Sequence, residues 1–91
     1  MKNNKKWLTI GTTVLLEGAT QPLMIVGRYQ LDEANNVYDY VGVLNPQGFE
    51  DSKSMYLFNE TSISEIIFES PQTDYEATYI EKLNDFIKEE E

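Results

Sequence analysis

The stretch IGTTVLLEGATQPLMIVGRYQ, residues 10–30, contains two apolar runs on either side of a short polar segment. The first run, residues 12–17, is rich in the β-branched residues that strands favour. The polar segment GATQ, residues 18–21, has the composition of a turn. The second run, residues 23–31, is short enough to favour a strand over a helix, and Gly27 at its middle indicates a bulge or a sharp bend. The stretch therefore predicts a β-hairpin.

More strands are expected downstream of this hairpin. The segment VYDYVGVL, residues 37–44, alternates between two faces, which is the period of a strand. The polar segment DEANN, residues 32–36, is rich in turn formers and connects the two strands. The patterns further along predict short strands at residues 55–58 and 64–70, with one tight helical turn at residues 59–63 between them.

The pattern changes from strand to helix after Pro71. Thr73 followed three residues later by Glu76 forms a capping box, which marks the start of a helix over residues 73–90. The apolar side of this helix recurs at helical spacing and consists of Tyr75, Tyr79, Leu83, Phe86 and Ile87, with Ile80 beside them. The opposite, charged side consists of Glu76, Glu81, Lys82, Asp85 and Lys88. The segment is therefore expected to form one amphipathic helix.

Together these elements predict an α+β fold that is mainly β, with a small, strongly bent antiparallel sheet of about five strands and one C-terminal amphipathic helix. An SH3-like, partly open barrel is favoured, because closure protects the edge strands of so small a domain. The alternative is an open sheet with the helix across one face. Residues 1–6 are expected to form a polar N-terminal arm, and residues 7–91 a single domain.

The composition excludes several classes of function. The chain has no cysteine and no histidine, so thiolate and imidazole metal ligands, cysteine nucleophiles and Ser-His pairs are all excluded. Three acids, Glu50, Asp51 and Glu60, are the nearest approach to paired catalytic carboxylates, but 16 acidic residues in 91 make such pairs inevitable by chance. We therefore expect no enzyme activity, no cofactor and no metal site.

The charge and hydropathy indicate where the protein acts. The chain has six tyrosines, and in other small barrels tyrosine side chains stack on nucleic-acid bases. A formal net charge of −9 repels nucleic acid, however, so nucleic-acid binding is not expected. No apolar run is long enough to span a membrane, and the N-terminus lacks the apolar region of a secretory signal. A cytoplasmic protein with no membrane insertion is expected.

Function is then expected to lie in surfaces that bind another protein. The helical stripe of Tyr75, Tyr79, Leu83 and Phe86 is either packed on the sheet or shared with a partner, because aromatic residues are enriched in interface cores. Phe49, in the loop that runs from Asn45 to Ser54, is the second candidate for a partner contact. The composition leaves the oligomeric state open.

Four segments taken together resemble a known family: LTIGTTVLLEG, PLMIVGRYQ, YDYVGVLNPQG and YLFNETSISEIIFES, within residues 8 to about 70. It is the small domain-of-unknown-function family encoded beside type VII secretion genes of Gram-positive bacteria, often near toxins with an LXG-type N-terminal domain. The resemblance implies a cytoplasmic accessory factor of toxin export, acting as partner, chaperone or targeting factor of an effector encoded nearby. It supplies no catalytic residues.

Two hypotheses of different kinds follow. The first is an export accessory that binds the N-terminal targeting region of an LXG-type effector toxin. The second is an immunity protein that binds and blocks the toxin's catalytic domain, and acidity fits it if the toxin is a nuclease with a basic cleft. The family context favours the first.

Overall fold

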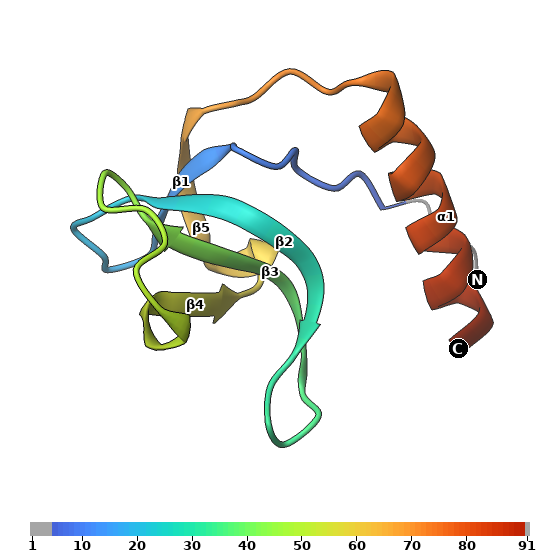
Figure 1. The fold of residues 1–91 in the computed structure, drawn as a ribbon, viewed down its shortest axis with the longest axis horizontal. Coiled ribbons are helices and arrows are strands. Elements are labelled where there is room, and N and C mark those ends of the chain that lie inside the picture. The colour runs from blue at the N-terminus through green and yellow to red at the C-terminus, as the bar shows by residue number, and fades with distance from the viewer. Residues whose placement is uncertain (1–4, 91) are drawn as a thin grey trace.

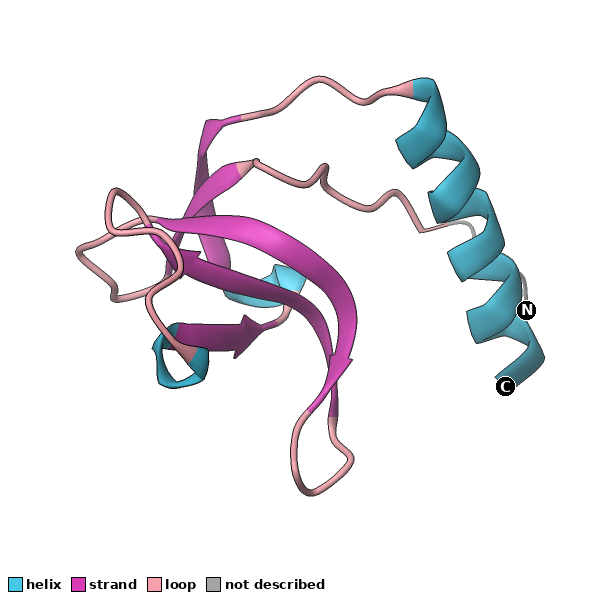
Figure 2. Ribbon diagram, in the orientation of Figure 1, coloured by secondary structure: helices cyan, strands magenta, loops and turns pink. Residues whose placement is uncertain are grey.

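The computed structural model describes residues 5–90. Most of the expected N-terminal arm, residues 1–4, lies outside the described residues, as does Glu91. In chain order the elements are β1 (Thr13–Leu16), β2 (Leu23–Leu31), β3 (Val37–Leu44), η1 (Ser52–Ser54), β4 (Met55–Phe58), η2 (Glu60–Ser62), β5 (Ile63–Phe68) and α1 (Asp74–Glu90). Figure 2 shows the strands on one side of the molecule and the single long helix on the other.

All five strands form one antiparallel sheet in the order β4-β3-β2-β1-β5. Strands β1, β2 and β3 each pair with the next strand along the chain, and β5 returns to pair with β1. The sheet is strongly bent but not closed, so β4 and β5 remain its two edges (Figure 1). The predicted class, α+β and mainly β with one C-terminal helix, is confirmed.

The predicted hairpins form with small differences in their bounds. The register between β2 and β3 shifts after Ile25, which confirms the bulge expected at Gly27. A Cβ atom at Gly27 would lie 2.7 Å from Val41 Cγ1, so a larger residue would force the two strands apart at this bulge. The fifth strand starts one residue earlier and ends two residues earlier than residues 64–70, because the chain leaves β1 after Phe68.

The loop between β2 and β3 is held by its own acid. Asp32 Oδ1 accepts hydrogen bonds from the backbone N–H of Ala34 at 2.8 Å and of Asn36 at 2.9 Å. The Asn36 bonds are the main cause that lowers the pKa of the Asp32 carboxyl below its usual value. The acid of DEANN therefore closes a turn, as its composition predicted.

One face of the sheet carries the core. Its buried side chains are Val14, Leu23, Ile25, Tyr40 and Phe58, and they join Trp7 and Leu83 in a single cluster. The Trp7 and Tyr40 rings lie 5.7 Å apart at 82°, the edge-to-face arrangement that aromatic pairs prefer. Helix α1 thus covers the core from the far side through Leu83, while the segment around Trp7 fills the space between helix and sheet (Figure 1).

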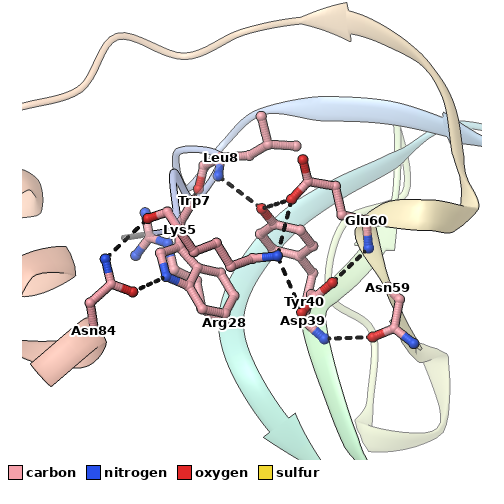
Figure 3. Close-up of polar contacts among 9 residues, drawn as sticks. All are labelled: Lys5, Trp7, Leu8, Arg28, Asp39, Tyr40, Asn59, Glu60 and Asn84. Atoms are coloured by element: carbon pink, nitrogen blue, oxygen red, sulfur yellow. Dashed lines mark hydrogen bonds and ion pairs between the residues drawn. The ribbon is translucent and has the colours of Figure 1, made fainter. Parts of the chain in front are cut away.

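Polar contacts fix this N-terminal segment to both neighbours, as Figure 3 shows. On the helix side, the indole N–H of Trp7 donates to Asn84 Oδ1 at 2.8 Å, and Asn84 Nδ2 donates to the carbonyl of Lys5 at 3.0 Å. On the sheet side, the backbone N–H of Leu8 donates to the Tyr40 hydroxyl at 2.9 Å. Lys5 Nζ adds an ion pair with Glu60 at 3.3 Å. The segment therefore connects α1 to the sheet.

Helix α1 begins as the capping box predicted, but only half of the box forms. The backbone N–H of Glu76 donates to Thr73 Oγ1 at 3.1 Å. The Glu76 carboxylate, which the sequence placed on the charged outer side, instead turns inward to Arg28 and Ile10. The assignment of Glu76 to the outer side is wrong. The buried Arg28 guanidinium on β2 attracts the Glu76 carboxylate more strongly than the backbone N–H of Thr73 does, because a hydrogen bond between two charged groups is stronger than one to a neutral donor.

Tyr40 gives the fold a measurable pH dependence. Burial raises the pKa of its phenol from 10.0 to about 12, since the ionised form loses its hydration inside the core. The folded state therefore favours the protonated phenol, and this contribution to stability is complete below pH 10 and declines as the pH rises towards 12. We expect Tyr40 to give a late step, near pH 12, in a phenolate absorbance titration.

The Tyr40→Phe variant is the control for this titration. It should lack the late step near pH 12. It should also lose about 1 to 2 kcal/mol of stability, because Leu8 N–H keeps no acceptor. Completion of all phenolate absorbance below pH 11 in protein that is still folded would contradict the assignment.

Candidate partner-binding site

A buried ion pair holds the start of α1 against β2. The Arg28 guanidinium is paired with Glu76 Oε2, and their side chains are only 3% and 13% exposed. Arg28 Nε also donates to the carbonyl of Leu8 at 3.2 Å, and Glu76 Oε2 accepts from the backbone N–H of Ile10 at 2.7 Å. A buried charge pair needs further hydrogen bonds to offset its lost hydration, and here the N-terminal segment supplies two of them.

The next residue on β2, Tyr29, has an unusual backbone. Its φ of 53° lies in the left-handed region, which is uncommon for a residue with a bulky side chain. The side chain of Gln30 reaches back across it and donates to the carbonyl of Arg28 at 2.9 Å. Because such conformations cost about 1 to 3 kcal/mol and gather at functional sites, Tyr29 marks this part of β2 as a candidate site.

A groove runs between this part of β2 and the middle of α1. Its volume is about 430 Å³. The lining residues are Arg28, Tyr29, Gln30, Tyr79, Lys82, Leu83 and Phe86. The rings of Tyr29 and Phe86 meet edge to face at 6.1 Å across it, and the Arg28 guanidinium lies 5.8 Å from the centre of the Tyr79 ring. We call these seven residues the aromatic groove.

The structure divides the predicted helical stripe in two. Leu83 is buried at 9% exposure and belongs to the core, with Ile80 and Ile87 packed beside it. Tyr79 and Phe86 are about half exposed, at 53% and 50%, and line the aromatic groove. Tyr75 is 91% exposed, one helical turn before Tyr79. The stripe therefore provides both a core contact and an exposed aromatic surface.

Phe49 lies apart from this surface. It is 65% exposed in the loop between β3 and β4. That loop is at the end of the sheet away from α1 (Figure 1). The structure therefore does not bring the two predicted contact regions together, and a single small epitope would not include both.

The aromatic groove suits binding more than catalysis. Its apolar and aromatic walls, with a few polar groups at fixed places, are the usual composition of a recognition surface. Its one exposed cation, Lys82, lies on the helix, while Arg28 is already paired. Within residues 5–90 no three acidic side chains are arranged to hold a metal ion, and no helix is long and apolar enough to cross a membrane.

Sequence patterns did not identify Arg28 and Tyr29 as members of the site. Both sit in a strand that reads as a continuous apolar run, where an arginine looks like a solvent-facing residue. The available signal was the adjacent Gly27, which predicted a break in the strand. The break changes the course of β2 just before the residues that face α1.

Comparisons with known proteins give one match. The family model described as "Domain of unknown function (DUF4176)" matches residues 7–79. This range contains the five strands, Arg28 and the start of α1 as far as Tyr79. Neither the curated proteins nor the solved structures include a match to the chain.

Replacement of the buried acid tests how the groove is held. Glu76→Gln leaves the Arg28 charge buried without a counter-ion, so we expect the free energy of unfolding to fall by about 2 to 4 kcal/mol in urea denaturation. Glu81→Gln is the matched control, because it makes the same change of charge at an exposed position of the same helix. It should change stability by less than about 0.5 kcal/mol. Equal effects of the two variants would show that the ion pair contributes nothing.

Proposed function

This chain belongs to the DUF4176 family of domains of unknown function, and on that premise we propose that it is a non-enzymatic, cytoplasmic accessory protein of type VII secretion. In this proposal it acts as a binding partner, chaperone or targeting factor for an LXG-type effector toxin encoded nearby. The secretion context rests on the resemblance of its sequence segments to the family encoded beside such toxins. The family match over residues 7–79 is consistent with that resemblance.

The exposed aromatic surface at the groove is the observation that carries a binding role. Tyr79 and Phe86 keep about half of their surface exposed although apolar burial would stabilise the fold by about 25 cal/mol per Å². Aromatic side chains in such a position are typical of the residues that dominate binding energy at interfaces. The strained backbone of Tyr29 holds a third aromatic ring at the same place.

The partner proposed for this surface is the N-terminal targeting region of the effector. An apolar, aromatic groove on a rigid scaffold accepts the apolar face of an amphipathic helix. The high negative charge then keeps the accessory and its complex soluble before export.

The charge favours one alternative. A net charge of −9 suits an immunity protein that blocks the basic cleft of a nuclease toxin, because carboxylates can occupy the place of the substrate's phosphates. The two roles differ in which half of the toxin is bound. Co-purification with the separated N-terminal and C-terminal halves distinguishes them.

Genetics gives a second distinction. Deletion of an export accessory should abolish secretion of the effector without making the producing cell sensitive to it. Deletion of an immunity protein should be lethal when the toxin is expressed. If the protein co-purifies with the C-terminal toxin domain and its deletion is lethal when the toxin is expressed, the immunity role replaces the export role.

Tyr79→Ala tests the binding surface itself. We expect at least a tenfold, or about 1.4 kcal/mol, loss of affinity for the effector's N-terminal half in isothermal titration calorimetry, because Tyr79 lines the groove. Stability should fall by less than about 1 kcal/mol, since the ring is half exposed and the Arg28 guanidinium lies 5.8 Å from its centre.

The matched control for this test is Tyr56→Ala. Tyr56 is a comparably exposed tyrosine, at 44%, on edge strand β4. Its replacement should leave the affinity within about twofold. A large loss of stability with unchanged affinity of the folded fraction for Tyr79→Ala would place the partner surface elsewhere, with the Phe49 loop as the next region to test.

A further inference from the structure

Strand β5 is an edge of the sheet with an unusually apolar surface. It pairs with β1 on one side, and no strand among residues 5–90 pairs with its other side. Five of its six residues, Ser64 to Phe68, are exposed. Three consecutive large side chains, Ile66, Ile67 and Phe68, expose 45%, 50% and 57% of their surface. An open edge presents a row of backbone N–H and C=O groups that can pair with another chain.

Common protective features are missing from this edge. Proteins usually shield open edges with lysine, with proline or with a covering segment. The sequence of β5, ISEIIF, has neither lysine nor proline, and its charged residue is Glu65. The register shifts between β1 and β5 bend the strand, but they leave its apolar side chains exposed. The edge is therefore open to a further strand.

A hollow of about 280 Å³ lies beside the strand. It is lined by Leu8, Glu60, Ile63, Ser64, Glu65 and Ile66. Its apolar residues suit an aliphatic stem, and its two carboxylates suit a cationic tip, which together describe a lysine or arginine side chain. Glu60 already contacts Lys5 Nζ at 3.3 Å, so Glu65 is the main acid to receive a new cation.

We propose that the open edge of β5 binds an extended segment of a partner protein as a sixth strand, with a lysine or arginine of that segment in the hollow. Backbone hydrogen bonds would supply affinity, and the hollow would supply specificity, as in other cases of strand addition. The exposed Ile66, Ile67 and Phe68 would pack against apolar residues on either side of the basic one.

Charge decides between a foreign segment and a second copy of the chain. A second copy would bring another net charge of −9 and another Glu65 to the same edge. Like charges opposite each other destabilise a strand pair, whereas a basic segment is attracted. The occupant is therefore an apolar and basic segment. This surface is separate from the aromatic groove, so the inference goes beyond the proposed function and does not rest on it.

The first test is a titration of isotope-labelled protein with a short peptide that alternates valine and lysine. We expect chemical-shift changes at the backbone amides of residues 63–68, with further changes at Leu8 and Glu60 around the hollow. A peptide with glutamate in place of lysine should bind at least about tenfold more weakly. A lysine peptide that is N-methylated at every residue should not bind, because it lacks the N–H donors of both of its edges.

Variants of the protein locate the binding. Ile67→Lys should weaken binding of the lysine peptide by about tenfold, because it places a cation on the edge. Leu31→Lys is the matched control, since Leu31 is a strand residue of similar exposure, 52%, far along β2. It should leave binding unchanged. Glu65→Lys, at another exposed position, gives the same test if Ile67→Lys does not fold.

Several results would overturn the proposal. These are shifts confined to residues outside β5 and the hollow, no shift at all at millimolar peptide, or equal binding by wild type and folded Ile67→Lys. Sedimentation that shows a dimer of the wild type, lost in Ile67→Lys, would assign the edge to a second copy instead.

Discussion

The ion pair between Arg28 and Glu76 joins three segments that lie far apart in the sequence: strand β2, helix α1 and the N-terminal segment. Charges so deeply buried are unstable unless every remaining donor and acceptor is satisfied. The carbonyl of Leu8 accepts from Arg28 and the backbone N–H of Ile10 donates to Glu76, so the N-terminal segment is held to both members of the pair. The position of the helix and the path of the N-terminal segment are thus constrained together.

The same constraint forms the aromatic groove. Glu76 holds the first turns of α1 against β2, and Asn84 holds the middle of the helix against Trp7 of the N-terminal segment. The aromatic groove lies beside Arg28, between β2 and the helix. Tyr29 adopts its left-handed backbone next to that groove. Strain of this kind persists where the surrounding structure determines the conformation, and Arg28 before it and Gln30 after it are both held by hydrogen bonds.

The groove and the β5 edge differ in what they offer a partner. The groove presents aromatic side chains on a helix and a strand, which suits a helical ligand. The edge presents backbone groups and a small acidic hollow, which suits an extended and basic one. In Figure 1 the helix and β5 stand on different sides of the molecule, so one partner would have to span both, or two ligands would bind independently.

Local pattern alone determined the strands, the helix and the Gly27 bulge, because each depends on the period of apolar residues or on backbone chemistry within a few positions. The capping bond from the Glu76 N–H to Thr73 was predictable for the same reason. Local pattern did not predict four other features: the inward turn of Glu76, the burial of Arg28, the left-handed backbone of Tyr29, and the division of the helical stripe between core and groove. The contacts of Glu76 with Arg28 and Ile10 join residues 48 and 66 positions apart, and only the tertiary structure brings a β2 cation, a helix acid and an N-terminal backbone to the same place.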